Sequence, residues 1–364
     1  MAAYISFEPK DFFNILTYTG DGTAARSLTG LGFLPAMSWI KCATEGYNHT
    51  LYDAVRGAGS GKALEPSTTQ DEGGVGDATY GYISSFDADG ISVAEGSGGS
   101  EIFNNADAET YLNWNWKAGT TSGIAAGSQT ITPSSYSIDT TRKFGIYAYT
   151  GNGTGGATIS HGLGSAPNAI IIKRLDTDYE WQVGQSYTTE GDGNDWGSAF
   201  VLNTNAVSSN NVAYWNDTDP TSTLITLGDH NSCNGSTYTY IMYAWCDVPG
   251  MQKFGMYMGN GNANGAQVNL GFRPALLITK RLSTSQWNMF SDTIPGYNLT
   301  PNRVFADSDA AQSTSTTNSV DFLSNGFKLR GSGDETNGNQ NNYIYFAWSK
   351  FPTVSSNDIP GVAR

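Results

Sequence analysis

The chain has 364 residues, which is more than one ordinary hydrophobic core holds and which corresponds by length to two or three domains. Acidic residues outnumber basic residues by 33 to 19, and the formal net charge of −14 argues against binding to nucleic acid or to an anionic membrane, because both need a basic face. The 44 glycines, and the 12% of aromatic residues beside only 14% of charged ones, are typical of short strands joined by tight turns.

The first recurring element along the chain is a glycine box that occurs three times, at Tyr18–Gly22, Tyr149–Gly153 and Tyr257–Gly261. A proline follows each box tyrosine after 17, 18 and 17 residues, and a lysine follows each proline after six residues. The prolines are Pro35, Pro167 and Pro274, and the lysines are Lys41, Lys173 and Lys280. Each unit closes on an aromatic strand, at Tyr111–Trp116, Tyr240–Trp245 and Tyr343–Trp348. Self-similarity at so long a period predicts three tandem copies of one domain rather than a solenoid.

The repeats set the expected domain boundaries. We expect an N-terminal anchor segment at residues 1–12, β repeat domain 1 at 13–117, a linker rich in glycine, serine and threonine at 118–143, β repeat domain 2 at 144–248, β repeat domain 3 at 249–352 and a C-terminal tail at 353–364. Each repeat is long enough to bury a core of its own, so we expect the copies to be independent of one another.

Within a unit the strand signals follow in a constant order. In the second unit Phe144–Tyr149 has nearly alternating apolar side chains, Ala157–Ser160 is a polar strand, and Ala169–Lys173 is β-branched and ends on a charge. Hairpins are expected at Asp89-Gly90 and Asn325-Gly326. No segment has sustained helical periodicity, although residues 103–112 are compatible with one helical turn. We therefore predict an all-β protein of three tandem antiparallel β-sandwich domains, jelly-roll or lectin-like, with a barrel as the alternative.

The glycine boxes could be phosphate-binding loops or turns. A phosphate loop needs a helix directly after it, whereas Thr154–Ile159 is strand-like. We therefore interpret the boxes as hairpin turns in which glycine supplies a positive φ. The residues of this structural repeat motif are Gly20, Gly22, Gly151, Gly153, Gly259, Gly261, Pro35, Pro167 and Pro274.

The recurring lysines end a buried strand, and Arg174 and Arg281 lie beside two of them. One interpretation is a binding site for an acidic sugar or a carboxylate. The other, which we favour, is a charged strand end that prevents edge-to-edge pairing of sheets.

The sequence indicates no cofactor and no metal site. The three cysteines are odd in number and differ in position between the units, which predicts free thiols in a protein made in a reducing cytoplasm; they are Cys42, Cys233 and Cys246. The histidines lack the ligand spacing of a zinc site; they are His49, His161 and His230. Calcium stays open as an alternative for three Asp/Asn/Gly-rich loops, at Asn104–Asp107, Gly191–Asp195 and Asp334–Asn342, although none has an Asp-x-Asp-x-Asp-Gly array.

Catalytic patterns are weak, and we expect the protein not to be an enzyme. Asp53 and Asp292 occupy similar points in units one and three, but unit two has no clear equivalent, and glycoside hydrolysis needs paired carboxylates. The chain has no Gly-x-Ser-x-Gly elbow and no convincing Ser-His-Asp order. A polysaccharide depolymerase remains the enzymatic alternative.

Nine tryptophans and 20 tyrosines exceed what three small cores require. In the first closing strand Trp114 and Trp116 point to one face, and Asn113 and Asn115 to the other. The rings are interpreted as core packing or, alternatively, as platforms for sugar or protein contact. Four aromatic residues in polar loops are our candidate binding residues, namely Trp196, Tyr214, Trp215 and Tyr297.

The order of motifs along the chain is as informative as the motifs themselves. The series consists of Tyr149–Gly153, His161–Gly164, Pro167, Ile171–Arg174, Trp181, Ser324–Arg330 and Tyr343–Ala347, between the ends Phe7–Phe12 and Ile359–Arg364. This arrangement resembles a repeat-domain family of virion structural proteins of tailed phages, especially phages of marine bacteria and cyanobacteria, which are often labelled tail fibre or adhesin. Unit one departs most from the pattern, with Cys42 in place of the arginine and Trp114-Asn115-Trp116 in its closing strand, and this fits a different task such as docking to the particle.

The resemblance implies a bacteriophage virion structural protein that acts as a tail fibre or receptor-binding adhesin, by multivalent non-covalent attachment to the host surface. The alternative is a capsid decoration, head-fibre or tail-tip structural protein without host binding. Expected partners are other virion proteins of the tail or capsid, further copies of the chain in a homo-oligomer, above all a trimer, and a glycan or protein of the host surface. Nucleic acid and membrane insertion are not expected. The start of the chain lacks the pattern of a secretory signal peptide, so we expect synthesis in the host cytoplasm and location in the virion.

Overall fold

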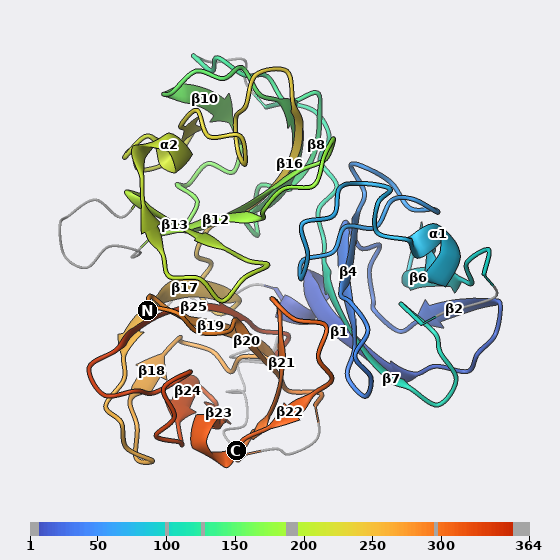
Figure 1. The fold of residues 1–364 in the computed structure, drawn as a ribbon, viewed down its shortest axis with the longest axis vertical. Coiled ribbons are helices and arrows are strands. Elements are labelled where there is room, and N and C mark those ends of the chain that lie inside the picture. Colours follow the sequence, from blue (N-terminus) through green and yellow to red (C-terminus); the bar gives the residue numbers. More distant parts are fainter. Residues whose placement is uncertain (1–6, 99–101, 125–127, 187–195, 295–297, 352–364) are drawn as a thin grey trace.

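The computed structural model describes residues 7–98, 102–124, 128–186, 196–294 and 298–351. In this part of the chain the regular structure consists of 25 β-strands and four short helical turns, and the strands pair in open antiparallel sheets. The prediction of an all-β sandwich fold is confirmed, and the barrel alternative is not realised. Figure 1 shows three lobes around a common centre, here called domain 1 (residues 7–117), domain 2 (118–248) and domain 3 (249–351).

Domain 1 packs a four-stranded inner sheet, in the order β1-β7-β3-β4, against a three-stranded outer sheet, in the order β2-β6-β5. Its elements are η1 (Pro9–Asp11), β1 (Phe13–Thr19), β2 (Ala25–Thr29), β3 (Met37–Cys42), β4 (Thr50–Asp53), α1 (Asp77–Tyr80), β5 (Tyr82–Asp87), β6 (Gly90–Ala94) and β7 (Thr110–Trp116). The hairpin expected at Asp89-Gly90 joins β5 to β6.

Domain 2 has an inner sheet of seven strands, in the order β14-β13-β12-β11-β16-β9-β8, and a two-stranded outer sheet, β10-β15. Its elements are β8 (Ser135–Asp139), β9 (Phe144–Thr150), β10 (Ala157–Ser160), β11 (Ala169–Arg174), β12 (Gln182–Gln185), β13 (Ser198–Val201), β14 (Ser209–Asn210), α2 (Val212–Trp215), β15 (Leu224–Leu227) and β16 (Thr239–Trp245). The expected linker at residues 118–143 is partly an edge of this domain, because β8 pairs with β9 and Ile131 bridges to Ile159.

Domain 3 has a six-stranded inner sheet, in the order β17-β25-β19-β20-β21-β22, and a three-stranded outer sheet, in the order β18-β24-β23. Its elements are β17 (Gln252–Met258), β18 (Gln267–Asn269), β19 (Leu276–Arg281), β20 (Asn288–Ser291), β21 (Asn302–Phe305), β22 (Ser313–Thr314), η2 (Thr316–Asn318), β23 (Val320–Leu323), β24 (Gly326–Leu329) and β25 (Asn342–Trp348). The hairpin expected at Asn325-Gly326 joins β23 to β24.

The three inner sheets repeat one pairing scheme. Each closing strand, β7, β16 or β25, lies between the strand that leads into the glycine box (β1, β9 or β17) and the strand that follows the motif proline. The closing tryptophan has the same partner position in all three domains, because Trp116 faces Met37, Trp245 faces Ala169 and Trp348 faces Leu276. The motif prolines are buried directly before β3, β11 and β19, where a residue without an N–H can start a strand.

A hydrophobic core shared by all three domains lies at the centre of the molecule. The closing tryptophans meet there edge to face, with ring centroids 6.3 Å apart for Trp116 and Trp245, 5.4 Å for Trp116 and Trp348, and 5.9 Å for Trp245 and Trp348. The remaining cavity on this axis is about 20 Å³, is lined by apolar side chains of all three domains and is little larger than the ~10–15 Å³ that one water needs. The centre is therefore a packed core and not a ligand channel.

Each sandwich also has an interior of its own between its two sheets. In domain 3 the closing strand turns Ile344, Phe346 and Trp348 to the shared core, while Tyr343 and Tyr345 face the interior of the sandwich. Alternation along the strand thus places apolar groups on both faces of the inner sheet. The expectation of independent copies is therefore wrong: three interiors exist, but the second face of each inner sheet is covered only by the other two domains.

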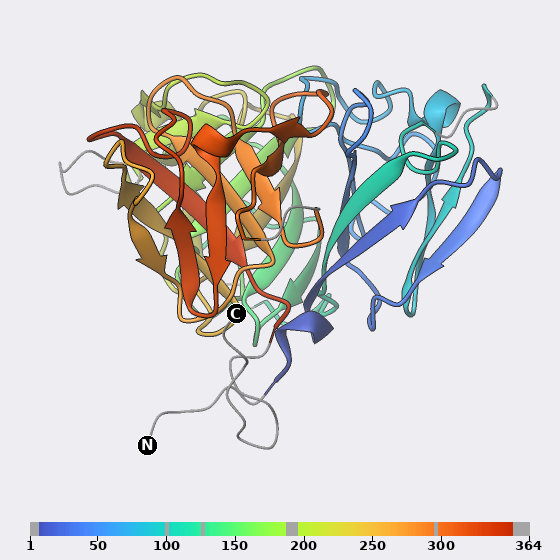
Figure 2. The same cartoon turned by 90° about the horizontal axis from the view of Figure 1, so that it is seen from below.

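The two ends of the inner sheets differ in character, as Figure 2 shows. The end that carries the closing tryptophans, where β1 begins and β25 ends, is here called the base. The opposite end, where the glycine boxes and α1 lie, is called the tip, and it faces the viewer in Figure 1. All three domains therefore place their glycine boxes at the same end of the molecule.

A side-chain hydrogen bond to a backbone carbonyl crosses each of the three domain boundaries, and in this set of three each domain donates to one neighbour and accepts from the other. The indole N–H of Trp181 in domain 2 donates to the carbonyl oxygen of Glu65 in domain 1, at 2.9 Å, and that of Trp287 in domain 3 donates to Val201 in domain 2, at 3.0 Å. In domain 1 the corresponding donor across the boundary is His49. Since Trp39 donates to its Nδ1, its Nε2 carries the proton and donates to Phe305 of domain 3, at 2.8 Å.

The recurring lysines lie at these same boundaries and are buried. Lys41 donates to three carbonyl oxygens, of which that of Asp309 belongs to domain 3, and Lys173 donates to the carbonyl of Thr69 in domain 1. Burial lowers the pKa of Lys41, Lys173 and Lys280 to about 8. The interpretation as edge protection is wrong, because β3, β11 and β19 have partners on both sides. Lys41 and Lys173 join domains instead, whereas Lys280 donates to carbonyls of its own domain and lies over the ring of Phe200 in domain 2, with Nζ 5.6 Å from the ring centroid.

In the part of the chain that the structure describes, no helix combines the length and the apolar character that crossing a bilayer demands.

The shared core predicts a coupled response to a single substitution. Trp116→Ala removes one ring from a centre that three domains line, and it should lower the free energy of unfolding by about 3–5 kcal/mol. Hydrogen exchange should then show weaker protection in the inner sheets of all three domains. Phe327→Ala, in the interior of domain 3, is the control and should act mainly on that domain. Protection lost in domain 1 alone after Trp116→Ala would contradict a shared core.

The buried lysines predict a particular pH dependence of stability. Because the folded pKa of Lys173 is about 8 and the ordinary value is 10.5, the unfolded chain binds more protons between these values, so this side chain makes stability rise with pH there. We expect the unfolding free energy of the wild type minus that of Lys173→Met to increase from about pH 8 to about pH 10, by at most ~1.4 kcal/mol per pH unit. Denaturant titrations at several pH values measure this difference, and a constant difference would refute the prediction.

Candidate functional site

The glycine boxes lie at the tip and join the two sheets of each sandwich. They are not the hairpin turns that we expected, because β1, β9 and β17 do not pair with the strands that follow them. The second glycine has a positive φ, of 63° at Gly22, 68° at Gly153 and 64° at Gly261. The first glycine is needed for space, since a Cβ at Gly151 would lie 2.3 Å from the carbonyl oxygen of Gly235.

A buried asparagine holds each box, and sequence reasoning missed it. Asn234 accepts a hydrogen bond from the N–H of Asn152 at 2.9 Å and donates to the carbonyls of Thr154 and Gly228 at 3.0 and 2.8 Å. Asn105 and Asn337 hold the other two boxes in the same way. The available signal was spacing, because each asparagine precedes the first tyrosine of its closing strand by six residues.

The tyrosine of each box stacks on the first tyrosine of the closing strand. Ring centroids are 5.3 Å apart for Tyr18 and Tyr111, 5.1 Å for Tyr149 and Tyr240, and 5.0 Å for Tyr257 and Tyr343. The hydroxyls donate to backbone carbonyls of the asparagine loop, for example from Tyr149 to Cys233 at 2.5 Å. The boxes thus form a rigid frame for the tip, and the loops that the frame leaves free are the candidate interaction surface.

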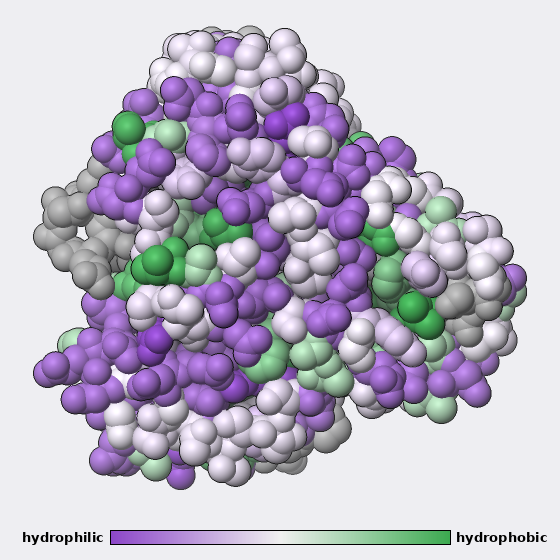
Figure 3. Space-filling view, in the orientation of Figure 1, coloured by the Kyte–Doolittle hydropathy of each residue, from purple (hydrophilic) through white to green (hydrophobic). Residues whose placement is uncertain are grey.

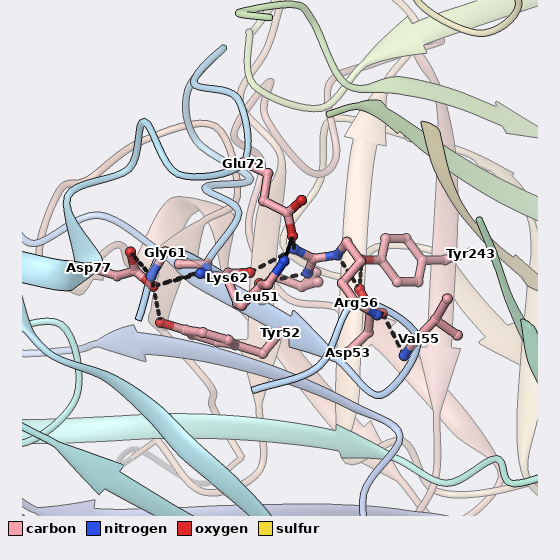
Figure 4. Close-up of polar contacts among 11 residues, drawn as sticks. Leu51, Tyr52, Asp53, Val55, Arg56, Gly61, Lys62, Glu72, Asp77 and Tyr243 are labelled. Atoms are coloured by element: carbon pink, nitrogen blue, oxygen red, sulfur yellow. Dashed lines mark hydrogen bonds and ion pairs between the residues drawn. The ribbon is translucent and has the colours of Figure 1, made fainter. Parts of the chain in front are cut away.

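The long loop of domain 1 sets this domain apart from the other two. Its residues 54–76 contain no helix and no strand. Loops of more than about 12–15 residues without regular structure are uncommon in compact domains and usually functional. Figure 4 shows the buried charges that hold this loop. Its fixed conformation is therefore built by specific side chains.

Arg56 is the first of these charges, and its side chain is 3% exposed. It pairs with Asp53 at 2.6 Å, donates to the carbonyl of Lys62 at 2.6 Å and contacts Glu72 at 3.4 Å. Tyr243 of domain 2 donates to the same carboxylate of Asp53 at 2.7 Å, so the loop is tied to the neighbouring domain as well (Figure 4). The surrounding carboxylates raise the pKa of Arg56 further above its usual range, and the guanidinium stays charged.

Asp77, the first residue of α1, is the second buried charge. Its carboxylate accepts from the hydroxyl of Tyr52 at 2.9 Å and from the backbone N–H groups of Gly61, Lys62 and Ala63 at 3.0, 3.2 and 3.0 Å. A buried carboxylate is stable only when such donors replace water. The middle of the loop is therefore fixed to α1.

The loop borders a pocket of about 330 Å³ at the tip of domain 1, here called the tip pocket. Its lining includes Tyr47, Asn48, Glu65, Gln70, Tyr80 and Phe103 of domain 1 and Asp309 of domain 3. The carboxylate of Glu65 accepts from Asn48 Nδ2 at 3.2 Å and from Thr68 Oγ1 at 2.9 Å. Burial raises the pKa of Glu65 above its ordinary value.

The structure places two of the four predicted binding residues differently from our expectation. Trp196 and Trp215 are 2% and 1% exposed and pack edge to face in the interior of domain 2, so they are core residues and not contact residues. The reason is Gly184 of β12, which has no side chain and leaves room for both rings. Tyr214 is half-buried beside His230, with ring centroids 4.6 Å apart. Tyr297 lies outside the described residues.

The two candidate catalytic carboxylates lie in different domains, and each is paired with a cation of its own domain. Asp53 is fully buried against Arg56, and Asp292 lies 3.1 Å from the Nζ of Lys350. Burial raises the pKa of Asp292. Neither carboxylate is positioned as half of a hydrolytic pair on a substrate cleft, so the structure does not bring the candidates together.

The cysteines and His161 lie in the interior of the domains. All three cysteines are free and buried, and burial raises the pKa of Cys233 and Cys246 to about 12. His161 is buried, with Nε2 3.1 Å from the carbonyl oxygen of Thr221. Among the described residues no group of three His, Cys, Asp or Glu side chains could hold a metal ion. The calcium alternative at Gly191–Asp195 lies outside these residues.

The tip face is largely hydrophilic, and its apolar groups gather at two places, over the boundary of domains 2 and 3 and on domain 1 (Figure 3). Exposed apolar residues near that boundary include Val207, at 56%, and Met258, at 60%. Val207 is placed there because the N–H of its neighbour Ser208 donates to Leu282 of domain 3 at 3.0 Å. Apolar groups rimmed by polar ones are typical of interaction surfaces.

The fold and this face together define a three-lobed β-sandwich protein with a largely hydrophilic tip face. A family described as "Domain of unknown function (DUF7483)" matches residues 8–352, and the chain belongs to this family. The match spans all three sandwiches as one unit, which agrees with the core that they share. No curated protein and no solved structure matches the chain.

The close packing at the glycine boxes predicts unequal losses of stability for two glycine substitutions. Gly151→Ala forces a Cβ against the backbone of Gly235 and should lower the free energy of unfolding by about 1–3 kcal/mol. Gly119→Ala, where a Cβ has nothing within 4 Å, should change it by no more than about 0.5 kcal/mol. Chemical denaturation compares the two, and equal effects would show that close approach is not what the first glycine provides.

Proposed function

We propose that this protein is a virion structural protein of a tailed phage, a tail-fibre or receptor-binding adhesin that attaches to the host surface with its tip face. The observation that carries the proposal is the polarity of the molecule, since β1 begins and β25 ends at the base while all three domains place their glycine boxes at the opposite end. A binding head on a fibre needs this arrangement. The motif order supports the phage context by resemblance.

Attachment is multivalent and non-covalent in this proposal. The shared core keeps three tips in a constant relation, so contacts by several loops add without the entropy cost of ordering flexible modules. A compact ring of three lobes takes the place of the extended rod that tandem independent domains imply. Asp53 pairs with Arg56 and Asp292 pairs with Lys350, and this supports a role without catalysis.

A second candidate is favoured by the threefold arrangement itself. One chain presents three similar domains around one axis, which suits a threefold position on a particle. In this candidate the protein is a capsid decoration, head fibre or tail-tip component that docks through its base and does not bind the host. The single chain supplies the threefold shape that we expected from a trimer, and a trimer of chains remains a proposal for the assembled virion.

Site-selective blocking tests the proposal, because the native cysteines are buried and an introduced surface cysteine can be labelled alone. Asp107→Cys, exposed at the tip, and Leu34→Cys, 52% exposed at the base, each receive a maleimide-linked polymer. Fluorescent protein is then bound to a panel of marine bacteria and cyanobacteria. We expect the tip label to abolish cell binding and the base label to leave it intact. Binding to phage particles but not to cells, blocked by the base label, would replace the adhesin with the decoration.

A further inference from the structure

We propose that the tip pocket of domain 1 binds one neutral sugar residue of a surface glycan. The inference rests on the proposed adhesive function and names the ligand class of one part of the tip face. The pocket, at about 330 Å³, is within the ~300–1,000 Å³ range of small-molecule sites and lies between domain 1 and the loop of domain 3 that carries Asp309.

The pocket combines ring surface with hydroxyl groups. Tyr80 is 43% exposed and its ring packs edge to face on Phe103, with centroids 5.6 Å apart. Tyr47 is half-buried and lines the same pocket. A tyrosine has an apolar body and a polar tip, which suits a sugar, whose C–H face packs on a ring while its hydroxyls bond at the rim.

The polar groups of the pocket suit the hydroxyls of a sugar. Glu65 is 2% exposed, and each of its two carboxylate oxygens has one protein donor, from Asn48 and from Thr68. A carboxylate offers about four acceptor positions, so lone pairs remain for two sugar hydroxyls. The amides of Asn48 and Gln70 add donors and acceptors along the same wall.

The fold itself does not require a carboxylate at this position. The backbone carbonyl of Glu65 accepts the indole N–H of Trp181 across the boundary, and Val201 and Phe305 perform the same task at the two other boundaries with apolar side chains. Burying a carboxylate costs stability unless its environment compensates. The acid is therefore specific to domain 1 and is explained by a ligand rather than by the boundary.

The charge of the pocket selects against acidic sugars. Glu65 and Asp309 line it, and its lining contains no lysine or arginine. Lys41 donates to the carbonyls of Glu45, Tyr47 and Asp309, of which the last two belong to lining residues, so its three N–H groups are used. An anionic sugar would meet two carboxylates without a free cation, whereas a neutral sugar would not.

The pocket is formed before the ligand arrives. Arg56 and Asp77 hold the loop that lines it, and Tyr243 ties that loop to domain 2. A preformed wall reduces the entropy lost on binding. This matters for sugars, because their hydroxyls bond to water nearly as well as to protein and the net gain on binding is small.

Ligand-observed NMR with the full chain tests this inference. The probes are glucose, galactose, mannose and N-acetylglucosamine, with glucuronic acid as the anionic probe, followed by neutral glucan, mannan and galactan. We expect saturable binding of at least one neutral probe and none of glucuronic acid. Tyr80→Ala and Glu65→Gln should each weaken that binding tenfold or more. Val212→Ala, 53% exposed on the corresponding short helix of domain 2, is the matched control and should bind as the wild type does.

The outcomes separate this inference from the proposed function. No saturable binding of any neutral probe, preference for glucuronic acid, or unchanged binding by both folded variants would overturn the sugar site. If the wild type and both variants attach equally well to cells, adhesion stands and the pocket is not its sugar site. If the wild type binds a neutral sugar in the pocket but attaches to no cell, the sugar site stands and the adhesin proposal fails. Melting temperatures of the variants confirm that each remains folded.

Discussion

The constraint on which the rest of the structure depends is that each inner sheet is apolar on both faces. A sandwich covers one face with its own outer sheet, and the other face carries large rings, among them Trp116, Trp245 and Trp348. Full burial of a side chain of this size contributes roughly 1.5–3 kcal/mol, so leaving three such faces in water would remove much of the stability of a typical domain. Three copies around one axis bury all three faces at once.

The boundaries between the domains are specified mainly through the backbone. The side chains of Trp181, Trp287 and His49 donate to carbonyl oxygens of the next domain, and two of the buried lysines, Lys41 and Lys173, also donate across a boundary. Because a carbonyl is present at every residue, the accepting position can vary in side chain without loss of the bond. This freedom lets one boundary carry a carboxylate at a place where the other two carry apolar groups.

Domain 1 departs most from its two sisters. Its closing strand turns Asn113 and Asn115 into its interior, where both bond to Ser38, while the corresponding strands of domains 2 and 3 present apolar or tyrosine side chains. Its long loop depends on Arg56 and Asp77, which have the geometry of structural charges. The sequence shows this departure, and the long loop borders the tip pocket, on the face away from the base. That domain 1 docks to the particle stays a prediction.

The sequence by itself determined the β class, the number of domains, the strand order within a unit and the positive φ of the second box glycine, because these follow from local periodicity, repeat spacing and the steric limits of single residues. Only the tertiary structure decided that Trp116, Trp245 and Trp348 share one core, that Lys41 and Lys173 join domains, and that Trp196 and Trp215 are interior residues. Those outcomes depend on which sheet faces pack together, and the residues that meet there are more than a hundred positions apart in the chain. A loop aromatic and a core aromatic look alike in sequence until a glycine such as Gly184, on another strand, is seen to make room for the ring.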